Sequence, residues 1–179
     1  MKKFIFVIAL IFCSVIAMAQ SSALTYSEVI KKEGLSKAEL YGGLREWVAT
    51  SYRSGKAVTQ MEDPATGVII LKANFPFKKG GIYSAYDGTV EYVLKLQAKD
   101  DRFKVEMSGI THQNKPGNAA HCSLGLITTD EKSGKGGLDK GSHNKIWKEV
   151  KEKSKAEFNY IVNSLNDWSS FNASEEEDW

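Results

Sequence analysis

Two neighbouring segments in the middle of the chain alternate apolar and polar residues. In 89-TVEYVLKLQAK-99 almost every second residue is apolar, and 102-RFKVEMSGI-110 repeats the pattern after Asp100 and Asp101. Successive side chains of a strand point to opposite faces, so each segment predicts a strand with one buried face. A two-residue connection joins antiparallel strands. We therefore expect a hairpin here, and the rest of the chain must build its sheet around that hairpin.

Five further segments complete the set of predicted elements. Residues 24–30, 57–62 and 67–75 have the composition of short strands, and a turn with Pro and Gly separates the last two. Residues 36–55 and 144–168 instead place apolar residues at steps of three and four, which is typical of amphipathic helices. The predicted order is therefore strand, helix, four strands, loop, helix.

The first predicted helix carries signals at both ends. Ser36 followed by Glu39 indicates a capping box, in which each side chain accepts the other residue's free backbone N–H. Gly55 is suited to end the helix. Inside the helix, Gly42 and Gly43 lower its intrinsic stability. We expect these two glycines to mark a close approach of the helix to the sheet.

Two amphipathic helices can cover one face of a sheet and leave the other face in water. We therefore expect one α+β domain over residues 20–170, with two layers and an antiparallel sheet of about five strands covered on one face by two helices. Residues 111–141 show no periodicity and contain the glycine-rich, charged stretch 132–141, which predicts a long loop. The uncovered face would carry both charge signs, as a solvated sheet does, on Gln60, Lys72, Glu91, Lys95, Gln97, Lys104 and Glu106.

The N-terminal residues have the pattern of a signal peptide. Lys2 and Lys3 precede an apolar run, and a site of the form small-x-small ends at Ala19. We expect residues 1–19 to be a signal peptide that is cleaved near Ala19 and Gln20. The protein would then be exported to the periplasm or secreted, with no transmembrane span after cleavage, because no second apolar run is long enough.

Two other interpretations of this leader remain open. It could stay attached as a membrane anchor, although the run is shorter than the roughly 20 apolar residues that a spanning helix needs. It could also carry a lipoprotein site at Cys13, although bulky Phe12 stands where a small residue is expected.

Without its leader the chain has no net charge. Lys2 and Lys3 account for two of the 24 Lys and Arg, which leaves 22 against 22 Asp and Glu. A nucleic-acid binder normally has a basic excess, because phosphate contacts supply most of the affinity. We therefore expect no nucleic-acid partner. Residues 171–179, which include 175-EEED-178, predict an acidic, solvated tail.

Three segments of the chain resemble an uncharacterised family of exported Bacteroidota domains with a TATA-binding-protein-like fold. The segments are 36-SKAELYGGLREWVA-49, 58-VTQMEDPATGVI-69 and 90-VEYVLKLQAKDDRFKVEMSGI-110. The residues that carry the resemblance are Glu39, Leu40, Tyr41 and Trp47, then Glu62, Asp63 and Gly67 before Val68 and Ile69, then Lys99, Asp100, Arg102 and Phe103. The resemblance covers about residues 24–111 and implies the fold. It implies no activity and no catalytic residues, and the name of the fold does not imply DNA binding.

The single cysteine of the cleaved chain, Cys122, follows His121 in 119-AAHCSLG-125. Together with His112 and His143, this pair could form a thiol catalyst or a zinc site. Neighbours in sequence seldom have the geometry of a nucleophile and its base, and the spacing of the four residues matches no zinc motif. We therefore expect a buried structural thiol and assign no catalytic, metal-binding or cofactor-binding residue.

Two other stretches have a structural explanation beside a functional one. Glu62 and Asp63 could be an acid and base pair, but adjacent strand residues point to opposite faces, and Asp63 before Pro64 suits a turn. Glycines in 78–88 could suggest phosphate binding, but the phosphate-loop pattern is missing. We expect a turn and a flexible hairpin loop.

These features favour an exported, non-enzymatic binding or interaction module over an enzyme. Its partner would be a protein or small-molecule ligand of the cell envelope, and the loops 76–88 and 111–141 would form the contact surface. No cofactor is expected. The alternative is a metal-dependent or thiol hydrolase built on His112, His121, Cys122 and His143.

Overall fold

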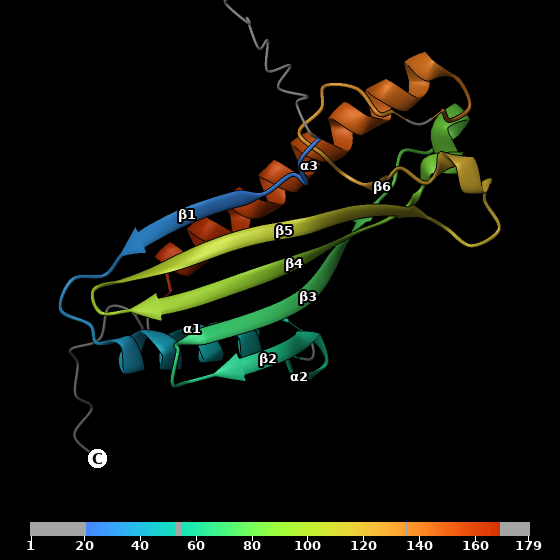
Figure 1. The fold of residues 1–179 in the computed structure, drawn as a ribbon. Coiled ribbons are helices and arrows are strands. Elements are labelled where there is room, and N and C mark those ends of the chain that lie inside the picture. The colour runs from blue at the N-terminus through green and yellow to red at the C-terminus, as the bar shows by residue number, and fades with distance from the viewer. Residues whose placement is uncertain (1–20, 53–54, 135, 169–179) are drawn as a thin grey trace, which may run out of the picture.

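The core of the protein is a six-stranded antiparallel sheet, seen in a computed structural model that describes residues 21–52, 55–134 and 136–168. The predicted signal peptide and acidic tail lie outside the described residues. The strands lie in the order β1-β5-β4-β3-β2, and β6 pairs with β5 beyond the start of β1 (Figure 1). Their bounds are β1 Tyr26–Lys31, β2 Thr59–Asp63, β3 Val68–Phe77, β4 Gly88–Lys99, β5 Arg102–Asn114 and β6 Gly125–Leu126.

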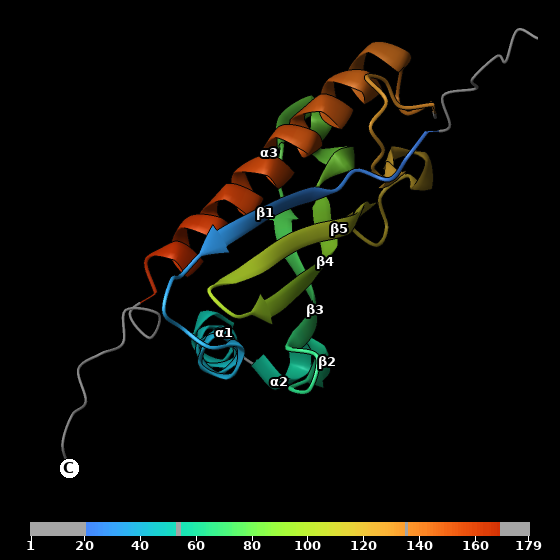
Figure 2. The same cartoon turned by 60° about the vertical axis from the view of Figure 1, so that its left-hand side comes forward.

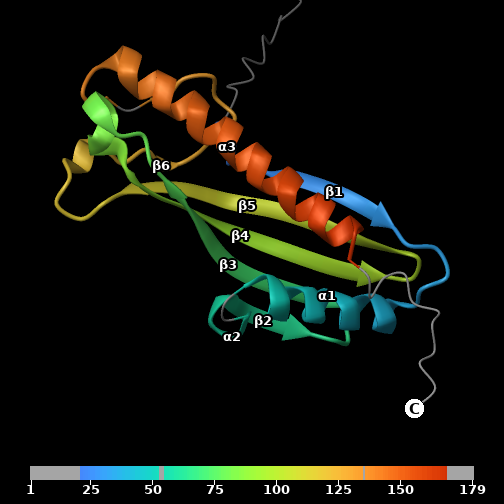
Figure 3. The same ribbon diagram turned by 180° about the vertical axis from the view of Figure 1, so that it is seen from behind.

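Two long helices, α1 (Lys37–Ser51) and α3 (Lys140–Asn166), cover the same face of this sheet (Figure 3). The other face is open. Three short elements, α2 (Gly55–Val58) and the 3-10 turns η1 (Gly81–Tyr86) and η2 (Ala120–Cys122), lie in the connections. The predicted two-layer α+β class and element order are confirmed, with β6 as a sixth strand. Among the described residues, no helix has the length and apolarity that crossing a membrane requires.

The central hairpin forms as its alternation predicts. Every second side chain of β4, from Val90 to Ala98, is buried under the helices, and so are Phe103, Val105 and Met107 of β5. Asp101 takes a left-handed φ of 62° in the turn, where its Oδ1 accepts the N–H of Gly34 at 2.8 Å. The turn therefore also fixes the connection between β1 and α1.

Strand β5 runs four residues beyond its predicted end, because a bulge shifts its phase. Gly109 has a φ of 61°, and the pairing with β4 shifts between Glu91 and Val93. After the bulge, Ile110 and His112 are the buried residues. The prediction that the loop starts at residue 111 is therefore wrong, and α3 already begins at Lys140.

The end of the first helix also differs from the prediction. Helix α1 ends at Ser51, and Tyr52 closes it by donating its N–H to Val48 O at 3.3 Å. Gly55 does not end α1. It begins α2, so close to the helix that an added Cβ would lie 3.1 Å from Ala49 Cα. Because α2 runs to residue 58, β2 begins at Thr59 and not at residue 57.

Within α1, the capping box of Ser36 and Glu39 is confirmed, with both hydrogen bonds present. The helix continues through Gly42 and Gly43 without interruption. Gly43 is buried, whereas Gly42 is exposed and an added Cβ there would meet nothing within 4 Å. Close approach to the sheet therefore does not explain Gly42.

Several residues that carry the family resemblance hold the fold together. Asp100 Oδ1 accepts the N–H of Lys37, the first residue of α1, at 2.8 Å. Gly67 has a φ of 70°, and an added Cβ would lie 2.8 Å from the carbonyl oxygen of Ala98. Trp47 is buried under the sheet and donates its Nε1–H to Ser164 Oγ of α3 at 3.0 Å. These residues therefore position the helices on the sheet.

The two ends of the described chain lie beside different parts of α3. Ser22 O accepts the N–H of Thr129 at 2.9 Å, close to the start of α3, where Trp147 Nε1–H donates to Asp130 O at 3.0 Å. At the other end, Lys32 Nζ donates to Asn166 O at 2.8 Å and holds the end of α3 beside the end of β1 (Figure 2).

Candidate functional site

Three of the four candidate residues of the long loop gather around Tyr86 at the end of η1. The side chains of Tyr86, His112, Cys122 and His143 are all fully buried. The bulge at Gly109 turns His112 inward, and η2 and the first turns of α3 bring Cys122 and His143 to the same place. His121 is exposed and stays outside this group.

Both ring nitrogens of His112 are engaged by the backbone. Nδ1 accepts the N–H of Leu124 at 3.2 Å, and Nε2 lies 2.9 Å from the carbonyl oxygen of Tyr86. A nitrogen that accepts an N–H carries no proton, so Nε2 must carry the proton and donate it to Tyr86 O. Burial is the main cause that lowers the pKa of His112, and the charge of His143 adds to it. His112 is therefore a neutral imidazole that joins two loops.

The hydroxyl of Tyr86 is the centre of the group. It lies 3.3 Å from Nδ1 of His143, accepts the N–H of Leu138 at 3.2 Å, and is in hydrogen-bonding contact with the thiol of Cys122. An added Cβ at Gly137 would overlap both Tyr86 and His143. The group is therefore closed by backbone on its outer side.

The chemistry of this group is that of a packed core and not of an activated nucleophile. Burial raises the pKa of the Cys122 thiol, whereas a reactive thiol needs a lowered pKa and access to a substrate. His112 has no nitrogen left to serve as a base or as a metal ligand without losing a backbone partner. In the part of the chain that the structure describes, no three His, Cys, Asp or Glu side chains are placed to hold a metal ion.

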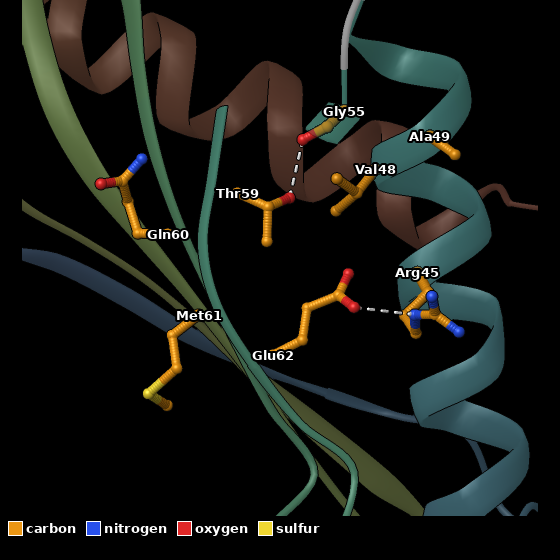
Figure 4. A pocket seen from close by; sticks show the side chains of 8 residues that line it. All are labelled: Arg45, Val48, Ala49, Gly55, Thr59, Gln60, Met61 and Glu62. Carbon is orange, nitrogen blue, oxygen red and sulfur yellow. Dashed lines mark hydrogen bonds and ion pairs between the residues drawn. The ribbon is translucent and has the colours of Figure 1, made fainter. Parts of the chain in front are cut away.

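A pocket lies at a different place on the molecule. A pocket of about 640 Å³ lies between α1 and the edge strand β2 (Figure 4). Its size falls within the range of roughly 300–1,000 Å³ that is usual for ligand sites. The residues that line it are Arg45, Val48, Ala49, Gly55, Thr59, Gln60, Met61 and Glu62.

The polar groups of this pocket come from opposite walls. Arg45 Nε of α1 lies 3.3 Å from Glu62 Oε2 of β2, and both side chains are partly exposed (Figure 4). Thr59 Oγ1 donates to the carbonyl oxygen of Gly55 at 2.7 Å and ties β2 to α2. The pocket thus offers one cation, one anion and the apolar side chain of Val48.

Glu62 and Asp63 have separate roles, as predicted. Asp63 Oδ1 accepts the N–H of Ala65 at 3.0 Å, and its Oδ2 accepts the hydroxyl of Thr66 at 2.6 Å. These contacts lower the pKa of Asp63, with the hydrogen bond from Thr66 as the main cause. Asp63 is therefore part of the turn, and Glu62 alone faces the pocket.

Sequence reasoning missed the pocket and the central role of Tyr86. Arg45 lies on the polar side of an amphipathic helix, where the sequence predicts an ordinary solvent-exposed side chain. Its partner Glu62 is 17 positions away, and only the packing of α1 beside β2 brings them together. For Tyr86 one general rule could have helped. A buried tyrosine hydroxyl needs polar partners, so a buried Tyr86 would predict polar side chains or backbone groups around it.

Comparison with known proteins identifies the fold but indicates no activity. The family model described as "Domain of unknown function (DUF4468) with TBP-like fold" matches residues 26–113. This segment contains the pocket and the whole of β1 to β4, and it ends before α3. No curated protein is significantly similar to this chain.

Two crystal structures from Bacteroidales resemble the molecule. A TBP-like protein from Parabacteroides distasonis aligns with a TM-score of 0.55 and 16% identity, over 82% of this chain and 94% of that one. A DUF4468 family protein from Bacteroides ovatus aligns with a TM-score of 0.49 and 16% identity, over 87% of this chain and 90% of that one. At this identity the first likeness shows the fold alone.

Proposed function

This chain belongs, through residues 26–113, to the family of domains of unknown function with a TBP-like fold, and from that premise we propose that it is a non-enzymatic binding module. The fold by itself fixes no activity. The observation that carries the proposal is the pocket between α1 and β2. The buried group around Tyr86 supports it too, because three of the four residues of the alternative hydrolase, His112, Cys122 and His143, are fully buried, and the backbone engages both ring nitrogens of His112.

The partner of the pocket is an extended peptide segment of another protein. Strand β2 pairs with β3 on one side, and within the described residues no strand pairs with its other side. An extended peptide can add to such an edge, with alternate side chains entering the neighbouring pocket. The bulge between Thr59 and Met61 limits the edge to a short register, which disfavours indiscriminate pairing. Arg45 and Glu62 would select a peptide with a charged group beside an apolar one.

A charge exchange across the pocket tests this function. Phage-displayed random peptides would be selected on the wild-type protein and their affinities measured by titration calorimetry. The double variant R45E/E62R keeps an ion pair but reverses its direction. Because an exposed ion pair contributes only about 0–1 kcal/mol, the variant should stay folded. We expect the selected peptides to bind it about tenfold more weakly, a loss of roughly 1.4 kcal/mol.

The open face supplies a matched control. Lys72 Nζ lies 3.0 Å from Glu91 Oε2 on the sheet face away from α1, so K72E/E91K makes the same kind of exchange far from the pocket. Peptide affinity should not change in this variant. If the selected peptides bound R45E/E62R as tightly as the wild type, the pocket would not be their site and the proposal would fail.

The end of the molecule formed by η1 and η2 is a second candidate contact surface. Asn118 Nδ2 donates to Ser84 O at 3.2 Å, so the two loops predicted as contact regions form one body. Ile82 is 82% exposed and Leu138 is 50% exposed on this body, which favours a protein contact there. The surface substitution Ile82→Ser would test it without touching the core.

The setting of this function is proposed to be outside the cytoplasm. The support is the leader pattern of residues 1–19. An unpaired thiol in an oxidising compartment is protected from reaction when it is fully buried, as Cys122 is.

A further inference from the structure

Three cationic side chains stand side by side where the hairpin ends on the open sheet face. Lys31 of β1 and Lys99 of β4 are both register partners of Arg102 in β5. An adjacent strand residue of each, Ile30, Ala98 or Phe103, is buried under the helices. The three side chains of the row therefore point to the open face, and all three are exposed. Lys31, Arg102 and Lys99 are called the basic row below.

The cations of the basic row are not held in ion pairs among the described residues, although carboxylates lie near them. Like charges directly opposite each other in a sheet repel. Other cations of the open face are paired: Lys72 with Glu91 at 3.0 Å, and Lys104 with Glu106 at 2.6 Å. Among the ion pairs of the described residues, none involves the basic row. The row therefore has cationic charge available for an external anionic group.

Two carboxylates near the basic row, those of Glu33 and Asp101, differ from each other in their contacts. Glu33 and Asp101 line a hollow of about 440 Å³ together with Lys31 and Arg102. Asp101 Oδ1 is held by the N–H of Gly34 at 2.8 Å, so this carboxylate is committed to the turn. Glu33 is exposed and reduces the charge of the row without forming an ion pair with it.

The fold brings the C-terminal end of α3 to the same corner of the molecule. Lys32 follows the basic-row residue Lys31, and its Nζ donates to Asn166 O at 2.8 Å (Figures 1 and 2). The described chain ends at Trp168, and the acidic segment 175-EEED-178 begins seven residues later. Seven extended residues reach about 23 Å. The row itself spans about 10 Å, because neighbouring strands are roughly 4.8 Å apart.

We propose that the acidic segment 175-EEED-178 docks on the basic row of its own chain. The segment has only to pass around the edge of β1, and its four carboxylates are opposite in charge to the three cations of the row, none of which is held in an ion pair. Exposed ion pairs are individually weak, but a short tether keeps the acidic segment near the row at roughly millimolar effective concentration. The contact is salt-dependent, because exposed charges are screened beyond about 10 Å at 0.1 M ionic strength.

Carbodiimide cross-linking with peptide mapping tests this contact directly. The reagent joins a lysine amine to a carboxylate that is already in contact with it, without a spacer. In the full chain we expect intramolecular links from Lys31 and Lys99 to the acidic segment. Their yield should fall several-fold when 0.5 M salt is added, about the ionic strength at which such contacts are screened.

The variant Arg102→Gln sharpens the test, because it weakens the row while keeping both reactive lysines. Its link yield should fall several-fold, whereas the control Lys72→Gln on the same face should leave the yield unchanged. Three results would overturn the proposal: links spread evenly over lysines of α3, an unchanged yield in Arg102→Gln, or links that join two chains in a mixture of isotope-labelled and unlabelled protein.

Discussion

His112 shows how the environment of one residue decides its chemistry. In the sequence it is a polar side chain just after a predicted strand, and its type suits a base or a zinc ligand. The bulge at Gly109 turns it inward, where two backbone groups take its two nitrogens. What remains is a neutral ring that packs edge-on against Phe77, with ring centroids 5.3 Å apart.

The lowered pKa of His112 predicts a loss of stability on mild acidification. Folding disfavours the protonated ring, so the unfolded chain binds the proton more readily. The stabilising contribution is complete above about pH 6.5, the ordinary pKa of His, and declines as the pH falls from there towards the lowered value. The free energy of unfolding should therefore fall between pH 7 and pH 5, by at most about 1.4 kcal/mol per pH unit for this one group. Urea denaturation at a series of pH values measures it.

The variant His112→Gln is the control for this pH dependence. An amide can both accept from Leu124 N–H and donate to Tyr86 O, but it does not titrate. Its stability should be flatter between pH 7 and pH 5. The acidic losses below about pH 4, where carboxylates titrate, should remain the same. An equal slope in both proteins would assign the effect to another group and contradict the prediction.

Single residues were partly predictable from the sequence. The buried state of Cys122 and the turn role of Asp63 follow from the ordinary behaviour of a lone thiol and of an Asp before Pro. The convergence of His112, Cys122 and His143 on Tyr86 does not follow, since it depends on a bulge and on the docking of two loops. Neither leaves a periodic trace in the sequence.

The elements are held in register by a few sites where backbones approach closely. Gly88 begins β4 opposite Asn114, the last residue of β5. Its neighbour Thr89 is exposed, whereas Gly88 itself is buried against the β5 backbone. This contact closes the far end of the hairpin, just where η1 enters the sheet.

Replacing Gly88 by alanine should destabilise the protein strongly. An added Cβ would overlap the carbonyl oxygen of Gln113 and the Cα of Asn114, and backbone in a paired strand cannot retreat. We expect Gly88→Ala to lower the free energy of unfolding by more than about 2 kcal/mol, in the range of other severe steric substitutions. Chemical denaturation with the unchanged chain as reference measures it.

Gly42→Ala is the matched control, and its effect should have the opposite sign. Gly42 lies inside α1, is exposed, and has open space where a Cβ would go. Alanine is preferred over glycine in a helix by about 1 kcal/mol. Gly42→Ala should therefore stabilise the protein. Equal effects at both positions would show that close backbone contact at Gly88 is not the cause.

The elements themselves were largely predictable, and their boundaries less so. The alternation over 89–99 and the helical spacing over 144–168 each follow from burial on one face, so the strand and the helix can be predicted directly from the sequence. The end of α1 and the start of β2 could not be predicted, because the short helix α2 connects the two elements and has no apolar periodicity of its own. Gly55 allows the backbone of α2 to lie close to the backbone of α1. From the sequence alone it looks like a residue that ends a helix.

On the scale of the whole molecule, the sheet depends on both helices. Helix α1 packs mainly on β4, while α3 packs on β1 and β5 with Val150, Phe158 and Ile161 buried against them. The segment that the family model matches ends at residue 113 and therefore includes only one of the two helices. The matched segment is a recognisable unit of sequence but not a complete core.

A fragment of residues 21–114 should therefore fail to fold cooperatively. Without α3, half of the inner sheet face would be exposed to water. We expect a non-cooperative urea transition, binding of the dye ANS and poor dispersion of amide signals in NMR. Adding a synthetic peptide of residues 140–168 should restore part of the dispersion. A sigmoidal transition of the fragment alone, with a slope that fits its size, would contradict this prediction.

The two-layer architecture was predictable because it needs only the element order and one apolar side per element. The pocket and the basic row were not. The pocket needs the spacing between Arg45 and Glu62 in three dimensions, and the row needs the pairing order of the strands. The open face mixes both charge signs, as expected, with Lys72 beside Glu91 and Lys104 beside Glu106. The basic row lies at one corner of this face because β1 pairs with β5 there.

The entry and exit of the chain beside different parts of α3 give the molecule a direction. Ser22 is tied to Thr129 beside Trp147, and Asn166 lies 19 residues further along α3, which is about 29 Å along the helix axis. A body tethered through its N-terminal side would present the hairpin corner as its distal tip. The domain would then act as a rigid spacer with the hairpin corner pointing outward. Fluorophores attached at the two ends of the described chain would show a fixed distance between them.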